Sequence, residues 1–146
     1  MNPRDFLQIA KDLLKIDKPA NCRTVFNRSY YAVYNVAVDL LEAAHVAVTR
    51  SAEGHEEVKR YLNNCGIQEL KEAQQKIVNL STNRIRADYR LNEKYVEKIE
   101  NAEMAVRRAE DIINIFDSHS SKSEREKIAK AVNEYKSKIE SASKAP

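Results

Sequence analysis

Apolar residues recur every three or four positions along most of this 146-residue chain, which is the spacing that places them on one face of a helix. Residues 20–48 show this spacing most clearly, because six apolar residues fall within about 60° of one another around a helical wheel. No segment alternates apolar and polar residues as a half-buried strand does. The pattern therefore predicts helices throughout. The predicted core face of residues 20–48 consists of Cys22, Phe26, Val33, Ala37, Leu40 and Ala44.

Start and stop signals divide the chain into six predicted helices. Pro3 in the first turn is typical of a helix start, the Cys65-Gly66 pair is typical of a helix end, and Ser123 with Glu126 has the spacing of a capping box. The predicted helices run from an Asn2 cap to just before Lys18-Pro19, then over residues 20–48, 55–63 and 67–87, from an Asn92 cap to residue 116, and from Ser123 onward, with fraying over 141–146.

These elements predict an all-α fold, an up-and-down antiparallel helical bundle of four main helices plus a short one, with an appended C-terminal helix. We expect residues 1–117 to form the bundle and residues 118–146 to form a polar linker and a basic amphipathic helix. Residues 1–117 hold 18 basic and 18 acidic residues, whereas residues 118–146 hold seven basic and four acidic ones. The net charge of +3 therefore belongs to the C-terminal segment, and it is too small to indicate a duplex-DNA-binding protein.

The composition also favours some functional classes over others. No apolar run approaches the roughly 20 residues that span a bilayer, and the N-terminus does not resemble a signal peptide, so we expect a cytoplasmic protein without membrane contact. Cys22 and Cys65 are interpreted as core residues. His45, His55 and His119 have no neighbouring ligands at metal-binding spacing, and the two isolated glycines form no phosphate loop. We expect no metal and no cofactor.

A polar stripe lies opposite the core face of the predicted 20–48 helix. It aligns guanidinium, amide, phenol and carboxylate groups over three turns, an arrangement that suits a solvated face, a cleft or a subunit contact. Three tyrosines within five positions favour the cleft or the contact. The stripe comprises Thr24, Arg28, Tyr31, Asn35 and Asp39, and the tyrosines are Tyr30, Tyr31 and Tyr34.

A second polar cluster closes the predicted 67–87 helix. Arg84 and Asp88 continue the line of its apolar residues and are four positions apart, so they can form an ion pair. Arg86, Tyr89 and Arg90 lie beside them. Two interpretations stay open at this point. The cluster is either a salt bridge that closes the bundle or a site that grips phosphate, since guanidinium groups match phosphate oxygens.

Three separate pieces of the chain resemble the HEPN superfamily (higher eukaryotes and prokaryotes nucleotide-binding domain), and more narrowly its small stand-alone prokaryotic members. They are RSYYAVY at residues 28–34, GHEEV at 54–58 and RIRADY at 84–89, and the resemblance covers about residues 3–116. It implies a helical bundle that usually dimerises, with polar motif residues of both subunits facing a shared cleft. Many members resemble metal-independent ribonucleases, and several are toxins encoded beside a minimal nucleotidyltransferase antitoxin.

The same resemblance shows where this chain departs from the active members. They use an arginine followed four to six residues later by a histidine, because cleaving RNA through its 2′-hydroxyl needs a proton acceptor and a cation on the phosphate. Here Tyr89 stands five residues after Arg84, and Asn35 stands where relatives often carry histidine. A tyrosine with a pKa near 10 is a poor base at neutral pH, and asparagine cannot act as one. His55 could substitute only if folding brings it to the cleft.

Three hypotheses follow. The first is a homodimer that binds RNA or nucleotide phosphate, with weak or lost ribonuclease activity, in a toxin–antitoxin or defence setting with a nucleotidyltransferase-type antitoxin as partner. The second is an active metal-independent endoribonuclease toxin, and the third is a non-catalytic protein-interaction module. The predicted phosphate-binding residues are Arg28, Arg84, Arg86 and Arg90, the candidate catalytic residues are Arg84, Tyr89 and His55, and the predicted cleft or dimer-interface residues are Tyr30, Tyr31, Tyr34, Asn35, Asp39 and Asp88.

Overall fold

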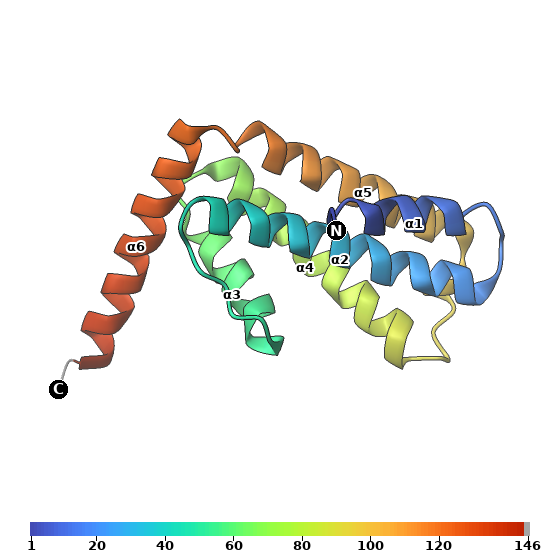
Figure 1. The fold of residues 1–146 in the computed structure, drawn as a ribbon. Helices are drawn as coiled ribbons and strands as arrows, with labels where there is room; N and C mark the ends of the chain where they lie inside the picture. The colour runs from blue at the N-terminus through green and yellow to red at the C-terminus, as the bar shows by residue number, and fades with distance from the viewer. Residues whose placement is uncertain (145–146) are drawn as a thin grey trace.

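The computed structural model describes residues 1–144, and these residues fold as a bundle of helices (Figure 1). Within them there are six α-helices, one short 3₁₀ helix and no strand, so the predicted all-α fold is confirmed. The elements are α1 (Asp5–Leu13), α2 (Pro19–Ala43), α3 (Ala52–Asn63), α4 (Gln68–Tyr89), η1 (Tyr95–Glu97), α5 (Ile99–Ser118) and α6 (Lys122–Lys144).

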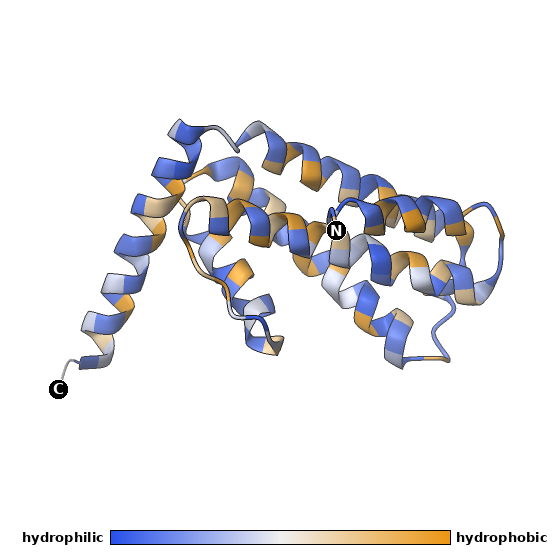
Figure 2. Ribbon diagram, in the orientation of Figure 1, coloured by the Kyte–Doolittle hydropathy of each residue, from blue (hydrophilic) through white to orange (hydrophobic). Residues whose placement is uncertain are grey.

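Helix α2 is the centre of the bundle, and α1, α4 and α5 pack against it. Its predicted core face is confirmed, since all six of those residues are buried. Because neighbours surround the helix, α2 also buries residues outside that face, among them Val25, Tyr30 and Val36. Figure 2 shows hydrophobic positions recurring along the whole of α2, as expected for a helix that packs on several sides. Cys22 and Cys65 are buried free cysteines, which confirms their interpretation as core residues.

The end of α2 differs from the prediction, which carried this helix to residue 48. Helix α2 ends at Ala43, and His45 takes a left-handed conformation with φ of 60°. The N–H of Val46 then bonds to the Leu41 carbonyl at 2.9 Å, which is the pairing of a Schellman cap. A glycine usually marks this turn in a sequence, and this chain has a histidine there.

Two other helix boundaries also differ. Helix α1 ends at Leu13, well before residue 17, and the side-chain amide of Asn21 donates to the carbonyl groups of Leu13 and Ile16, 3.3 Å from each oxygen. Asn92 does not cap the fifth helix. Residues 90–98 form a turn and η1 instead, and α5 begins at Ile99.

Helix α6 crosses one end of the bundle, and its C-terminal part projects away from the body (Figure 1). Its buried residues are Ile128 and Val132. The helix begins at Lys122, two residues earlier than predicted, because the Ser121 hydroxyl, and not that of Ser123, accepts from the Glu124 N–H at 3.3 Å. It stays helical to Lys144, so the predicted fraying does not occur over 141–144, and residues 145 and 146 lie outside the described residues.

Candidate functional site

The C-terminal end of α4, where the RIRADY segment lies, is fastened to α2 by Arg23. This guanidinium is only 11% exposed, and it donates to backbone carbonyl groups of the turn that follows α4 and to a carboxylate of η1. Such a fully bonded arginine is a structural one, because every bond it makes holds the protein to itself. Its acceptors are the carbonyl oxygens of Arg86, Ala87, Arg90, Leu91 and Glu93 and the carboxylate of Glu97.

The N-terminal end of α3 is fastened to the loop that precedes it. The Glu57 carboxylate accepts from both the backbone N–H and the hydroxyl of Thr49, each at 2.7 Å. Burial alone would raise the pKa of Glu57, but these two hydrogen bonds outweigh it and hold the pKa below its usual value,. Gly54 lets the loop approach closely, since a Cβ at this position would lie 2.0 Å from the Thr49 carbonyl oxygen. These contacts fix the position of His55.

His55 lies in an aromatic cluster with the tyrosines of α2. Its Nδ1 is 2.7 Å from the Tyr30 hydroxyl. Its ring stacks on Tyr34, with centroids 4.1 Å apart and planes inclined by 19°, and it meets Tyr31 edge-on at 6.1 Å. The predicted set of Tyr30, Tyr31 and Tyr34 is therefore one contiguous cluster, and folding brings His55 into it.

Arg84 covers the same cluster from α4. Its guanidinium carbon lies 5.1 Å from the ring centroid of Tyr30 and 5.9 Å from that of Tyr31, within cation–π range. Its side chain is 15% exposed, and Asp88 is 3.8 Å from its nearest nitrogen, too far for a hydrogen bond. Nε is buried and has no hydrogen-bond partner among residues 1–144. Unlike Arg23, this cation keeps unused hydrogen-bonding capacity.

Asp88 and Asn27 extend the cluster to the start of α2. The Asn27 amide donates to Asp88 at 3.1 Å, which leaves the carboxylate shared between Asn27 and Arg84. Arg28 lines the same groove as Asn27 and Asp88, and its guanidinium carbon lies 5.2 Å from the ring centroid of Phe6 in α1. A surface groove of about 350 Å³ runs between these residues and the end of α4. A second guanidinium therefore lies on the α2 side of the same groove as Asp88.

Tyr30 and His55 are held in their neutral forms. Burial raises the pKa of Tyr30 to about 12, with Ser81 and Arg84 acting in the opposite direction. Burial lowers the pKa of His55, and the positive charges of Arg84 and Lys59 lower it further,. At neutral pH the Arg84 guanidinium therefore lies beside an uncharged imidazole.

Comparison with known proteins identifies the family of the chain. A family model described as the HEPN domain matches residues 3–119. The chain belongs to the HEPN domain family. No curated protein and no solved structure gives a match to it. The matched range includes all of the residues in the Arg84 cluster and stops before α6.

Two of the predicted phosphate-binding residues lie apart from the HEPN cluster. Arg86 forms an ion pair with Glu93 and lies over the Tyr95 ring, 5.5 Å from its centroid. Arg90 bonds to the same Glu93 carboxylate at 3.1 Å. Both cations are therefore paired with residues of the turn after α4. Arg28 lines the groove beside Asp88, and Arg84 lies 3.8 Å from the Asp88 carboxylate, whereas Arg86 and Arg90 are on the Glu93 side.

The two residues that replace the family's histidines are also outside the cluster's contacts. Tyr89 is 74% exposed at the end of α4. Asn35 donates from its amide to the Tyr31 carbonyl of its own helix at 2.7 Å, and Asp39 is exposed one turn further on. Of the three candidate catalytic residues, Arg84 and His55 therefore share the tyrosines as neighbours, whereas Tyr89 faces solvent.

Sequence reasoning missed four residues that build the HEPN site. Arg23 and Asn27 precede the RSYYAVY segment, and they bond to residues more than 60 positions away, so no local pattern announces them. Glu57 carried a signal, because it lies within GHEEV and a buried glutamate on a helix must find donors. Ser81 carried none.

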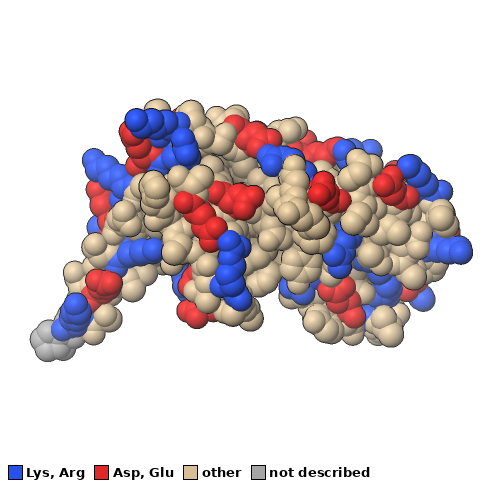
Figure 3. Space-filling model, viewed as in Figure 1, with Lys and Arg blue, Asp and Glu red and all other residues tan. Residues whose placement is uncertain are grey.

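The charges of the surface are mixed. Lys, Arg, Asp and Glu alternate over the face drawn in Figure 3 without a broad region of one sign. Among residues 1–144, no three His, Cys, Asp or Glu side chains come together as a metal site requires. Within the same part of the chain, no helix has both the length and the apolar content needed to cross a bilayer.

Proposed function

We propose that this HEPN protein is a homodimer that binds RNA or nucleotide phosphate at Arg84, with weak or absent ribonuclease activity. HEPN membership points to a nucleotide- or RNA-related function. The observation that carries the proposal is the state of the Arg84 guanidinium. It is largely buried, it has only a 3.8 Å ion pair with Asp88, and its Nε lacks a partner.

A cation in this state favours an anionic ligand. Removing a guanidinium from water costs free energy that charge-assisted hydrogen bonds normally offset. The protein satisfies this requirement at Arg23 with seven hydrogen bonds, and not at Arg84. A phosphate group has the charge and the planar pair of oxygens that a guanidinium binds best. Arg28 beside the groove is suited to a neighbouring phosphate of the same strand.

The second candidate is RNA cleavage, and His55 is the observation that favours it. A histidine that is neutral at pH 7 can act as a proton acceptor, and an adjacent arginine can stabilise the charge on a phosphate. Its Nδ1, however, is already engaged by the Tyr30 hydroxyl. We therefore rank phosphate binding above cleavage.

A contact surface for the proposed homodimer lies on α4. Three apolar residues of α4, Val78, Ile85 and Tyr89, are exposed at spacings of seven and four, which place them on one side of the helix. Leu91, two residues after the end of α4, is also exposed. We name Val78, Ile85, Tyr89 and Leu91 the α4 outer stripe. Because Arg84 is on the same helix, pairing through this stripe would bring two Arg84 sites together.

The setting we infer is cytoplasmic, in a toxin–antitoxin or defence system with a nucleotidyltransferase-type antitoxin as partner. The alternative of a pure interaction module keeps the same dimer and gives the arginines and tyrosines no ligand. In that alternative, residues 1–117 form the bundle, residues 118–146 form an appended segment, and the projecting helix α6 of that segment binds the partner.

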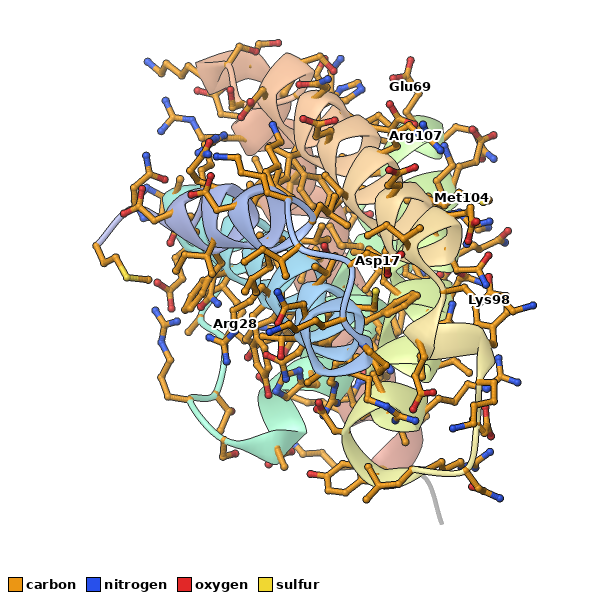
Figure 4. The ribbon with its side chains drawn as sticks, turned by 90° about the vertical axis from the view of Figure 1, so that its right-hand side faces the viewer. Asp17, Arg28, Glu69, Lys98, Met104 and Arg107 are labelled. Atoms are coloured by element: carbon orange, nitrogen blue, oxygen red, sulfur yellow. The ribbon has the colours of Figure 1, made fainter. Side chains whose placement is uncertain are left out.

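RNA binding and cleavage can be tested with one fluorescein-labelled single-stranded RNA. We expect saturable binding by anisotropy at low salt, weakening as salt rises because phosphate contacts release counterions, and little cleavage of the same RNA in EDTA. Arg84→Ala should lose at least about tenfold in affinity, whereas Arg107→Ala, which removes an exposed arginine of α5 (Figure 4), should change it less than twofold.

Each alternative has its own outcome in this experiment. Rapid cleavage in EDTA that Arg84→Ala abolishes would support the ribonuclease and contradict the proposal of lost activity. RNA that neither binds nor is cut would leave the interaction module. Equal losses in Arg84→Ala and Arg107→Ala would show that binding depends on overall charge and not on this site.

A further inference from the structure

Tyr30 and His55 make the most buried polar contact of the Arg84 cluster. The Tyr30 side chain is 1% exposed, and its hydroxyl lies 2.7 Å from His55 Nδ1. The imidazole also stacks on Tyr34 and Tyr30, inclined by 19° and 17°. Turning the ring by 180° would keep these stacks but present a carbon atom to the phenol. The hydrogen bond therefore selects which edge of the imidazole faces the core.

The direction of this hydrogen bond follows from the protonation of its partners. The raised pKa of Tyr30 keeps the phenol protonated at neutral pH, and a buried O–H needs an acceptor. The lowered pKa of His55 keeps the imidazole neutral, so one ring nitrogen carries a proton and the other accepts. The charged groups acting on His55 are Arg84 and Lys59, which disfavour its protonation, and Glu56, which favours it. Ser81 also acts on the Tyr30 hydroxyl, and its own hydroxyl can donate to the phenol oxygen. We therefore assign His55 Nδ1, 2.7 Å away, as the acceptor of the Tyr30 proton.

We propose that Tyr30 is a positioning residue whose hydroxyl donates to Nδ1 of His55, fixes the imidazole proton on Nε2, and makes His55 a hydrogen-bond donor to the anion that Arg84 binds. The tautomer follows from the contact between Tyr30 and His55. The role of Nε2–H toward an anion rests on the proposed function of the Arg84 site.

This arrangement gives a physical reason for binding RNA without cutting it. A general base must present an unprotonated nitrogen to the 2′-hydroxyl. In His55, the unprotonated nitrogen faces the buried phenol, and the other nitrogen carries a proton. Such an imidazole can donate to a phosphate oxygen beside the Arg84 guanidinium. It cannot remove a proton from a sugar until Tyr30 releases Nδ1.

The tautomer can be read directly by NMR of the full-length protein with ¹⁵N-labelled histidine. Long-range ¹H–¹⁵N correlations distinguish a protonated ring nitrogen from an unprotonated one, and His55→Gln identifies the His55 signals among those of the three histidines. We expect an unprotonated, hydrogen-bonded Nδ1 and a protonated Nε2 at neutral pH. A proton on Nδ1 in the unchanged protein would overturn the proposal, and this result does not depend on any variant.

Two phenol-to-phenyl changes separate positioning from packing. Tyr30→Phe keeps the ring and removes the donor, so the His55 Nδ1 resonance should shift and the Nδ1–H tautomer should appear. Tyr34→Phe keeps the 4.1 Å stack on His55, so it should leave the ¹⁵N pattern unchanged. An unaltered Nδ1 signal in Tyr30→Phe would contradict a role for the hydroxyl.

RNA affinity then tests the second part of the proposal. With the labelled single-stranded RNA, Tyr30→Phe should bind about 3- to 10-fold more weakly, the loss expected from one misplaced hydrogen bond. Equal affinity in Tyr30→Phe and the unchanged protein would contradict the donor role of Nε2–H. If the unchanged protein binds no RNA, the proposed function fails, whereas the tautomer is still decided by the NMR spectra.

Discussion

At the scale of single residues, the chemistry of the Arg84 site depends on contacts between distant positions. The sequence offered His55 as a base for Arg84 only if folding brings it to the cleft, because the two residues lie on different helices. In the structure, both contact Tyr30 and Tyr31. Tyr89 is closer to Arg84 in the sequence than His55 is. It is the last residue of α4, however, and its side chain is exposed.

Gly54 shows how one residue type sets this geometry. A Cβ at position 54 would meet the Thr49 carbonyl oxygen at 2.0 Å and the Tyr34 hydroxyl at 2.9 Å. The first contact is with backbone, so the loop itself would have to move. The close packing next to His55 therefore requires the glycine of the GHEEV segment, although glycine has a low helix propensity and this position lies within α3.

We predict that Gly54→Ala destabilises the protein by about 2 kcal/mol. Overpacking a closely packed site costs about 3 kcal/mol, and the better helix propensity of alanine returns about 1 kcal/mol of this. Urea denaturation followed by circular dichroism measures the change. Glu53→Ala, at the exposed neighbouring position, should stay within about 0.5 kcal/mol. A Gly54→Ala variant as stable as the unchanged protein would show that the loop and α3 are not in close contact.

At the scale of helices, the hydrophobic pattern located the six α-helices, missed the short helix η1 and misplaced several boundaries. The apolar lines in α2 and α4 were predicted because burial repeats with the helix period. The helix ends were predicted wrongly where the capping residue is not one of the types that usually mark a cap in a sequence. His45 ends α2 without glycine, and Arg23 binds the turn after α4 from 60 or more positions away, so Asn92 never becomes a cap.

The connection between α2 and α3 depends on one buried carboxylate. Glu57 accepts from the Thr49 N–H and from the Thr49 hydroxyl, and its pKa is lower when folded than its unfolded value near 4.5. A carboxylate with a lowered folded pKa adds stability above its unfolded pKa and loses it as pH falls through the folded value. Below about pH 4.5, the anchor of His55 should therefore weaken.

We predict that Glu57→Gln lowers the free energy of unfolding by about 2 kcal/mol at pH 7. The two Thr49 donors bond to different carboxylate oxygens, and glutamine has an N–H₂ group in place of one of them. The difference should shrink as pH falls below about 4.5, where the unchanged protein loses the same interaction. Thermal unfolding at a series of pH values measures this. The matched control is Glu53→Gln on the same helix. A difference that stays constant from pH 7 to pH 3 would contradict a role for the Glu57 charge.

At the scale of the whole molecule, sequence and structure agree on the class of fold and leave assembly to experiment. The bundle and an appended C-terminal helix were predicted from helix count and spacing, but not the crossing of the bundle end by α6. The predicted cleft or interface tyrosines Tyr30 and Tyr34 are buried within the chain, and the sequence does not show which apolar residues folding leaves exposed. The α4 outer stripe is such a surface, whereas charges of both signs are mixed on the face drawn in Figure 3.

We predict that Ile85→Glu converts the proposed homodimer into a monomer, because a charge in the middle of the α4 outer stripe would be buried without a partner on association. Size-exclusion chromatography with light scattering measures the mass against 16.8 kDa for one chain. Ile139→Glu changes an exposed isoleucine of α6 and should leave the dimer intact. The contact is placed wrongly if Ile85→Glu stays dimeric, and a protein that is monomeric at all concentrations has no such dimer.

The central claim is that the Arg84 guanidinium takes an anionic ligand, and its own Nε–H signal tests this most directly. In a ¹H–¹⁵N spectrum of the ¹⁵N-arginine-labelled protein, the signal is assigned by its loss in Arg84→Lys. We predict that adding single-stranded RNA shifts it saturably and that salt reverses the shift, while the Nε–H of Arg23 stays in place. An Arg84 signal that does not move at RNA concentrations that saturate binding would contradict the account.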